Sequence, residues 1–278
     1  MTAAEILTLV THLGLLIGDK VSPDDKHWEL YLILREIVDI VLAPSYQEKR
    51  FDQLDTLVEF HNNLFIELSN EGLKNKFHHL VHYKSHIKKF GPLIHLWVMR
   101  LEAKHQPSKA AANVILSRRN ISHSLGLKSQ LQVMNAIVNG SKNPVTAVSP
   151  KGFWTSADEV EILENVTVPN NFPSELLCTD WVKFHGVLYT EETVIIQEIQ
   201  NDIPLFFKIH SIFLSDKDEV FFVCNAIDVI EFNSHFYAYK VQLTDSFCVI
   251  DCHKVQIHSA CSILSKLTGD FITLRHKW

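Results

Sequence analysis

The chain has 278 residues, 46% of them hydrophobic, and a formal net charge of −6 at pH 7. This composition allows a packed core and excludes collagen-like and intrinsically disordered proteins. The length exceeds that of a typical single domain, so we expect two folded units. No run approaches eighteen consecutive apolar residues, and the apolar stretch at 7–18 lacks a basic leader and a small-residue cleavage site. We therefore expect a soluble, intracellular protein that does not bind membranes.

Five cysteines, all in the second half of the chain, form no CxxC pair. An odd number of cysteines in a chain without an export signal predicts reduced thiols and no disulfide framework. Cys248, Cys252 and Cys261 come close in sequence to His253 and His258, but all five fall on or near predicted strands. Buried thiols in a β core are therefore a simpler interpretation than a metal site.

Helical patterns open the chain. Apolar residues at helical spacing predict helices over residues 3–17 and 51–68. Between them, Ser22 is the expected N-cap and Pro23 the expected first residue of a helix that stops before Pro44. These segments predict an all-helical unit.

The segment KFHHLVHYKSHIKKFGPLIHLWVMRLEAKHQ, residues 76–106, holds six histidines and six lysines or arginines but one acid. Gly91 and Pro92 predict the end of one helix and the start of the next. The second of these helices, from about Leu93 to Gln106, is apolar around most of its circumference. We therefore expect it to be central and buried.

Three histidines of the first of these helices, His78, His82 and His86, are spaced by four residues and lie opposite the apolar stripe. This spacing can supply two ligands to a metal ion, so the three are candidate metal ligands. Two ligands do not complete a site, and a solvated or phosphate-facing surface is the simpler interpretation.

The pattern changes after the helical unit. Pro, Ser and Asn are frequent from 141 to 179, which predicts a linker. From residue 180 the hydrophobic period moves towards two, in segments rich in Val, Ile, Phe and Tyr. The predicted fold class is α+β, with a helical domain over 1–140, a linker over 141–179 and a small antiparallel β-barrel or curled sheet over 180–278.

Charge divides the chain into three parts. Residues 1–73 have five basic and thirteen acidic side chains, residues 74–157 have thirteen and one, and residues 158–278 have eight and eighteen. A basic block of this kind is typical of proteins that bind a polyanion such as DNA. The alternative is that the block pairs with the acidic flanks within one molecule, and charge alone does not decide between the two.

If the block binds DNA, its basic side chains contact phosphates. The candidate residues are Lys74, Lys76, Lys84, Lys88, Lys89, Arg100, Lys104, Arg118, Arg119 and Lys128. Such contacts carry little sequence information and are sensitive to salt.

Glu102 is the one acid of the basic block. A carboxylate on a buried helix among cations either pairs with an arginine or lysine, or binds a divalent ion in a nucleic-acid-cutting site. The second role needs two or three acids from different elements. We therefore expect no cofactor, and Mg²⁺ only if further acids join Glu102. A nucleophile elbow, a phosphate-binding loop and a dinucleotide fingerprint are all absent from the sequence.

Two strings carry a resemblance to a known family: LIGDKVSPDDKHWELYLILREIVDIVLAP and KFHHLVHYKSHIKKFGPLIHLWVMRLEAKHQ. They resemble the C-terminal part of DNA transposases of the EnSpm/CACTA type found in animal genomes. The resemblance covers about residues 10–128, and GPLIHLW followed by RLEAKH is its most specific portion. The β strings FHGVLY, LFFKIHSIF and HFYAYKV extend it to most of the chain, less distinctively.

The resemblance implies a catalytic role for one residue, a set of partners and a cellular location. In such transposases this part follows a core of the ribonuclease H kind, and an acid on a late helix completes the catalytic carboxylates. The resemblance implies that role for Glu102, DNA as a partner and a nuclear location. A full-length transposase or a chromatin protein is the implied protein partner.

The sequence departs from the family in two ways. Pro107 should kink or end the basic helix expected after Gln106. The sequence also starts without the catalytic core or a DNA-binding finger. We therefore expect a catalytically incomplete transposase remnant that binds DNA through residues 74–128. The alternatives are a metal-dependent strand-cleaving subunit that uses Glu102 with acids from elsewhere, and a protein-interaction module built on the β-barrel.

Overall fold

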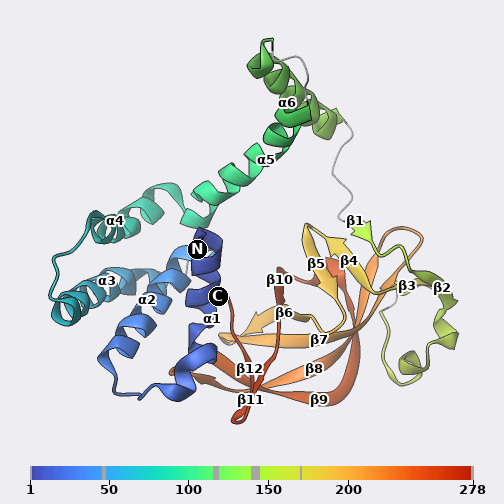
Figure 1. The fold of residues 1–278 in the computed structure, drawn as a ribbon. Coiled ribbons are helices and arrows are strands. Elements are labelled where there is room, and N and C mark those ends of the chain that lie inside the picture. The colour runs from blue at the N-terminus through green and yellow to red at the C-terminus, as the bar shows by residue number, and fades with distance from the viewer. Residues whose placement is uncertain (1, 46–47, 115–118, 139–144, 170, 277–278) are drawn as a thin grey trace.

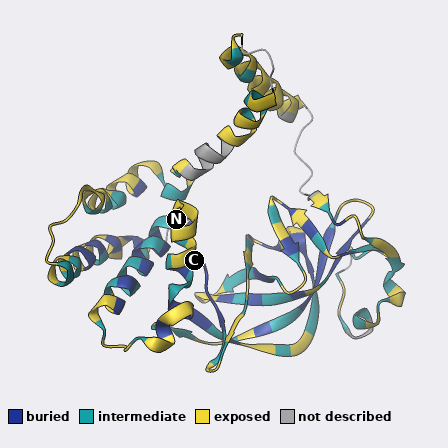
Figure 2. Ribbon diagram, viewed as in Figure 1, coloured by how far each residue is buried: buried dark blue, intermediate teal, exposed yellow. Residues whose placement is uncertain are grey.

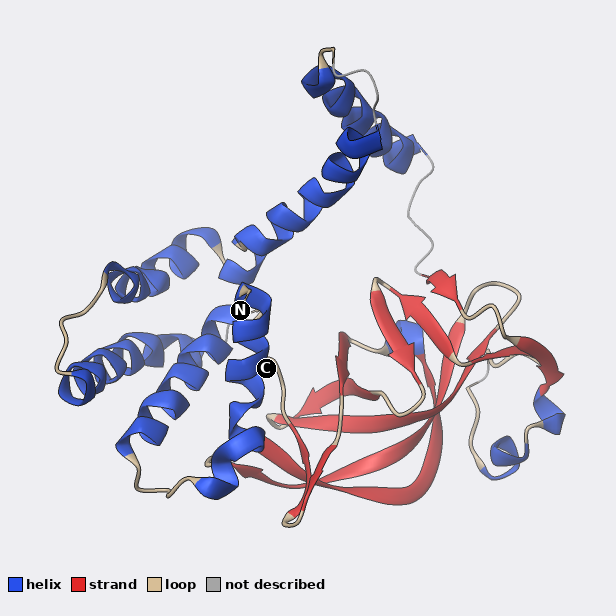
Figure 3. Cartoon of the chain, in the orientation of Figure 1, coloured by secondary structure: helices blue, strands red, loops and turns tan. Residues whose placement is uncertain are grey.

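The computed structural model describes residues 2–45, 48–114, 119–138, 145–169 and 171–276. Helices form the first half of the chain and antiparallel sheets the second half (Figure 1, Figure 3). The α+β fold class predicted from the sequence is therefore confirmed.

Four helices form the body of the helical part, close to where the hydrophobic pattern predicts them. They are α1 (Ala3–Ile17), α2 (Lys26–Leu42), α3 (Glu48–Ser69) and α4 (Asn75–Phe90). α2, α3 and α4 share one core, in which Ile37, Leu54, Val58 and Ile87 are buried. This core holds α4 against α3, and it fixes which face of α4 meets solvent.

The start of α2 differs from the prediction. Its N-cap is Asp25, whose carboxylate accepts hydrogen bonds from the backbone N–H groups of His27 at 2.8 Å and Trp28 at 3.2 Å. The residues from Ser22 to Asp25 form a turn, closed by the Asp25 N–H donating to the Ser22 carbonyl. An ionised side chain that accepts two N–H groups is a strong cap, and it starts the helix three residues later than predicted.

The segment after α4 also differs from the prediction. A short 3-10 helix, η2 (Leu93–Leu96), precedes α5 (Val98–Val114), and α6 (Ile121–Val138) follows. Leu96 and Val98 are 54% and 60% exposed, so the expectation of a central, buried helix is wrong for these residues. α5 also continues past Pro107. An exposed helix tolerates the missing backbone donor better than a buried one, because water reaches the carbonyl that loses its partner.

The β part consists of two antiparallel sheets. Its strands are β1 (Val145–Val148), β2 (Phe153–Ser156), β3 (Glu175–Thr179), β4 (Trp181–Phe184), β5 (Val187–Thr190), β6 (Val194–Gln200), β7 (Ile203–Leu214), β8 (Val220–Asn233), β9 (Ala238–Asp251), β10 (Ile257–Cys261), β11 (Leu264–Lys266) and β12 (Gly269–Ile272). The order β1-β4-β5 forms the small sheet, and the order β10-β6-β7-β8-β9-β12-β11 forms the large one. Within the described residues the large sheet is curled and open, because its end strands β10 and β11 do not pair with each other (Figure 1).

The two sheets pack against each other around buried aromatic side chains. Phe184 and Tyr189 of the small sheet share a core with Phe222 and Ile250 of the large sheet. Three strands of this part fall within the segment predicted as a linker over 141–179: β1 pairs with β4, β2 with β3, and β3 with β7. Its Pro, Ser and Asn residues indicated turns, but the short strands between them left no clear period.

The helical and β parts are joined by buried contacts. Leu15 of α1 packs with Phe236, in the turn between β8 and β9, and with Phe271 of β12. Gly14 lies so close to this turn that a Cβ atom there would sit 2.0 Å from the Phe236 carbonyl oxygen. Only a residue without a side chain allows this approach.

Replacing Gly14 with alanine is therefore expected to lower the free energy of unfolding by about 1–3 kcal/mol, because backbone must move to admit the methyl group. Urea denaturation measures the change. Gly126, an exposed position of α6 with open space around it, is the matched control. Its replacement by alanine is expected to stabilise by up to about 1 kcal/mol. Equal effects at the two positions would refute the close approach.

Charged side chains are also buried at this junction. Arg35 and Asp39 of α2 are 1% and 0% exposed, with Arg35 Nη1 3.7 Å from Asp39 Oδ1. Asp39 Oδ2 accepts hydrogen bonds from Arg50 Nη2 at 2.7 Å and from the Tyr237 hydroxyl at 2.9 Å. Arg35 also donates to the Leu274 carbonyl, and its guanidinium lies over the Tyr237 ring. One carboxylate thus links α2 and α3 to the turn between β8 and β9.

His276, near the end of the chain, should make stability depend on pH. Burial, together with Arg275 and Arg35, lowers its pKa from 6.5 to about 4. Between these values the unfolded state binds a proton that the folded state does not. The free energy of unfolding should therefore fall as the pH decreases from 6.5 to 4, by about 3 kcal/mol from this group. Denaturation of His276→Asn across this range is the measurement, and an unchanged pH dependence would contradict the assignment.

Candidate nucleic-acid interface and a cavity at the junction

The exposed face of α4 carries histidines, as the sequence predicts. Ile87 is buried on the opposite face, whereas His78, His82 and His86 are exposed. The Nε2 atoms of His78 and His82 lie 3.0 Å apart. Among the described residues, no three His, Cys, Asp or Glu side chains are placed to hold one metal ion. In the described part of the chain, these histidines therefore supply a pair of candidate ligands and not a complete metal site.

Three lysines of α4 also face solvent. Lys76, Lys88 and Lys89 are exposed, and no described carboxylate lies within ion-pair distance of them. The Lys89 ammonium lies 5.1 Å from the centre of the Phe90 ring, a contact that leaves its charge available. α4 contains no acid. Its exposed lysines lie near its two ends, with the three histidines between them.

Two of the predicted phosphate contacts are engaged within the molecule. Lys84 Nζ lies 3.0 Å from Asp55 Oδ2 and 3.6 Å from Asp52 Oδ1, and these pairs join α4 to α3. Lys74 Nζ lies 3.3 Å from Glu71 Oε2. Pairing with the acidic flank, the alternative interpretation of the charge pattern, thus holds for these two lysines and not for the other three lysines of α4.

Of the other predicted basic residues, Arg100 and Lys104 belong to α5, Lys128 to α6 and Arg119 to the turn before α6, and both helices project away from the body of the protein (Figure 1). Most of their described side chains are exposed (Figure 2). Arg119 and Lys128 are exposed there, as is Lys109, which the sequence analysis did not single out. No described carboxylate pairs with these three cations.

Four predicted site residues lie wholly or partly outside the described residues. Arg118 is outside them, and the side chains of Arg100, Glu102 and Lys104 on α5 are not described. The catalytic role that the family resemblance implies for Glu102 therefore stays a prediction.

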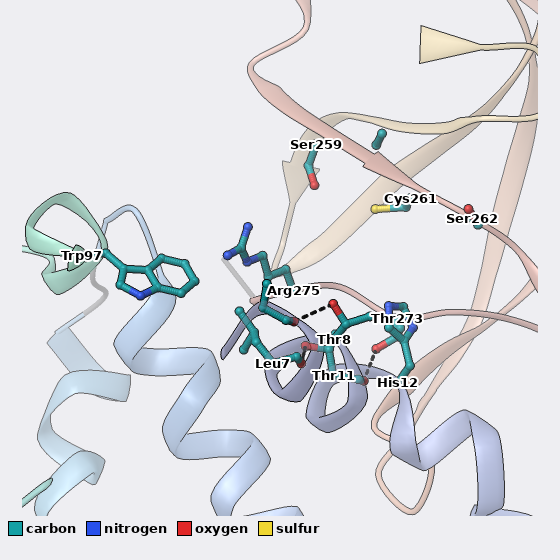
Figure 4. A pocket seen from close by; sticks show the side chains of 12 residues that line it. Leu7, Thr8, Thr11, His12, Trp97, Ser259, Cys261, Ser262, Thr273 and Arg275 are labelled. Atoms are coloured by element: carbon teal, nitrogen blue, oxygen red, sulfur yellow. Dashed lines mark hydrogen bonds between the residues drawn. The ribbon is translucent and has the colours of Figure 1, made fainter. Parts of the chain in front are cut away.

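A cavity of about 550 Å³, which was not predicted from the sequence, opens at the junction of the helical and β parts. Its walls come from α1, from Trp97 between η2 and α5, from β10 and the residues after it, and from the segment after β12 (Figure 4). These segments are far apart in the sequence, so no local motif marks the site.

The floor of the cavity is rich in hydroxyl groups that already donate their protons. The Thr8 hydroxyl donates to the Ala4 carbonyl at 3.0 Å and the Thr11 hydroxyl to the Leu7 carbonyl at 2.9 Å. The Thr273 hydroxyl donates to the Thr11 carbonyl at 3.4 Å. A hydroxyl has one proton and two lone pairs, so these three groups can offer only lone pairs to a ligand.

Arg275 gives the described lining its one arginine. Arg275 Cζ lies 5.0 Å from the centre of the Trp97 ring, which holds the guanidinium against an aromatic face. His12 also lines the cavity, and its pKa is lowered by burial and by Arg35, so it is neutral at pH 7. None of the described lining residues is an Asp or Glu.

Comparison of the chain with models of protein families, with curated proteins and with solved structures found no match. None of the helices within the described ranges is long and apolar enough to cross a membrane.

Proposed function

We propose that this chain binds duplex DNA through the exposed cations of α4, α5 and α6. The observation that carries the proposal is a surface with cations and no acidic partners. Its members are Lys76, Lys88, Lys89, Lys109, Arg119 and Lys128, all exposed and without an ion pair to a described carboxylate. In residues 74–157 the sequence has one acid against thirteen basic residues.

The chemistry of this surface favours the phosphate backbone over the bases. Lysines near both ends of α4 and cations of the projecting segment from α5 to α6 can contact phosphates without entering a groove. Binding of this kind releases counterions, so its affinity falls steeply with salt and varies little with sequence. The resemblance of residues 10–128 to EnSpm/CACTA-type transposases points to the same ligand, and in this proposal the chain is a derivative of such a protein.

The proposal is tested by titrating the full chain into a fluorescein-labelled DNA duplex and measuring anisotropy. Saturable binding at low salt is expected, with little difference between duplexes of unrelated sequence. An unlabelled duplex should compete, and a labelled duplex of uncharged peptide nucleic acid should give no signal, because it has no phosphates for the cations to contact. Absence of binding to the DNA duplex at low salt would refute the proposal.

A further inference from the structure

We infer that α4 binds one divalent transition-metal ion, of the class of Cu²⁺ and Zn²⁺, between His78 and His82. Helical spacing alone is equally compatible with a solvated surface. What distinguishes these two residues is that their Nε2 atoms converge to a separation of 3.0 Å. Neither residue is one of the six cations of the proposed DNA-binding surface, so the inference does not depend on the proposed function.

The separation of the two nitrogens fits a single ion. Zn²⁺ binds imidazole nitrogens at about 2.0–2.1 Å. Two such bonds that meet between a right angle and the tetrahedral angle place their nitrogens about 2.8–3.4 Å apart. The observed 3.0 Å lies within this range. A metal ion can therefore bridge the two rings with little movement of either side chain.

The two rings are joined by a hydrogen bond, which a metal ion would replace. The hydrogen bond uses one proton, which one Nε2 donates and the other accepts. With an ion bound at both Nε2 atoms, each neutral ring carries its proton on Nδ1. Both side chains are exposed, so water can solvate the two Nδ1–H groups.

The opposite face of α4 holds the helix in place. Phe77 packs on Phe65 of α3, with ring centres 4.5 Å apart. Tyr83 packs against the core that α2, α3 and α4 share. His78 and His82 are therefore each next in sequence to a residue that anchors the helix. Binding an ion has to order only the two side chains, which keeps its entropic cost low.

The donor atoms select a transition metal. Imidazole suits Cu²⁺, Ni²⁺ and Zn²⁺, and Cu²⁺ binds most tightly in this series. Mg²⁺ and Ca²⁺ prefer oxygen ligands, and α4 contains no acid. Since the described residues offer no group of three ligands, water fills the other positions of the ion. Such a site exchanges its ion more readily than a closed structural site.

His86 continues the row of histidines but does not join the pair. Its ring centre lies 6.2 Å from that of His82, with an interplanar angle of 28°. The ring centres of His78 and His82 lie 4.6 Å apart, with an interplanar angle of 87°. Within the described residues, only the second pair brings its ring nitrogens within hydrogen-bond distance. His86 therefore provides a matched control for the site.

Isothermal titration of the full chain with CuCl₂ tests the inference. We expect one tight site per chain with a Kd below about 100 µM, followed by weaker binding to the remaining histidines. Zn²⁺ should bind at least about tenfold more weakly than Cu²⁺, and Mg²⁺ should not bind measurably. With half an equivalent of Cu²⁺, the electron paramagnetic resonance spectrum should show two equatorial nitrogen ligands. Absence of the tight site would overturn the inference.

Three variants locate the site. His78→Gln and His82→Gln should each weaken the tight site by at least about tenfold, because each leaves one of the two ligands. His86→Gln removes an exposed histidine one turn further along α4 and should leave the affinity unchanged. Loss of the tight site in His86→Gln would place the ion elsewhere and refute the assignment, as would unchanged affinity in His78→Gln.

A further measurement separates this inference from the proposed function. In the presence of EDTA, His82→Gln should bind the DNA duplex like the unmodified chain, because none of the six exposed cations is changed. Failure of either proposal therefore leaves the other intact.

Discussion

Replacing Asp39 with alanine is expected to lower the free energy of unfolding by about 3–5 kcal/mol, the largest effect on stability that we predict. Asp39 is fully buried and its two carboxylate oxygens face Arg35, Arg50 and the Tyr237 hydroxyl. Without it, the Arg35 guanidinium, which is 1% exposed, keeps a charge that no other described carboxylate balances. A buried charge without a partner destabilises the folded state by far more than the intact ion pair stabilises it.

The same change should weaken the attachment of the helical part to the β part. Tyr237 lies in the turn between β8 and β9, and its backbone φ of 53° is held in the left-handed region by this packing. Guanidinium denaturation followed by circular dichroism measures the decrease in the free energy of unfolding. Asp55→Ala, which removes an exposed partner of Lys84, should cost less than about 1 kcal/mol and serves as the control. A loss for Asp39→Ala no larger than that of the control would contradict the account of the junction.

Changing Lys76, Lys88 and Lys89 together to glutamine should weaken duplex binding by about tenfold to about 500-fold at about 0.1 M salt. The upper figure holds if each lysine neutralises one phosphate, because each contact then contributes a slope of about 0.9 in the logarithmic salt dependence. The three side chains are exposed on a helix without acids, so their removal should leave the fold unchanged.

A matched variant separates this local effect from net charge. Lys20, Lys217 and Lys254 are also exposed but lie away from α4, α5 and α6. Their joint replacement by glutamine changes the net charge equally and should weaken binding less than about threefold. Similar losses in the two triple variants would show that the duplex does not recognise α4.

Local sequence patterns predicted where most of the helices lie. Tertiary contacts decide which of their faces are buried, and local patterns do not encode those contacts. Hydrophobic spacing placed α1 to α4. The string FHGVLY forms a hairpin turn between β4 and β5, where His185 and Gly186 both have positive φ, and this turn was not predicted. The segment 93–106 is apolar enough for a core, but hydrophobicity does not state whether a partner surface is present. Leu96 and Val98 are exposed because no such partner covers them within the described residues.

The candidate sites were predictable only in part. The exposed histidines and lysines of α4 follow from its helical period, since an apolar stripe fixes the opposite face. The engagement of Lys84 by Asp52 and Asp55 does not follow, because the partners lie on another helix about thirty residues earlier. The cavity could not be predicted for the same reason. Thr11 and Thr273, which both line it, are hydrogen-bonded although most of the chain lies between them in the sequence.

The salt dependence of duplex binding tests the central claim most directly. Anisotropy titrations of the unmodified chain at several salt concentrations give the slope of log Kobs against log salt concentration. The claim that exposed cations hold the phosphate backbone predicts a slope of about −3 to −5, reduced in magnitude by about 2 to 3 in the Lys76, Lys88 and Lys89 triple variant. A slope near zero, or one that the triple variant leaves unchanged, would contradict it.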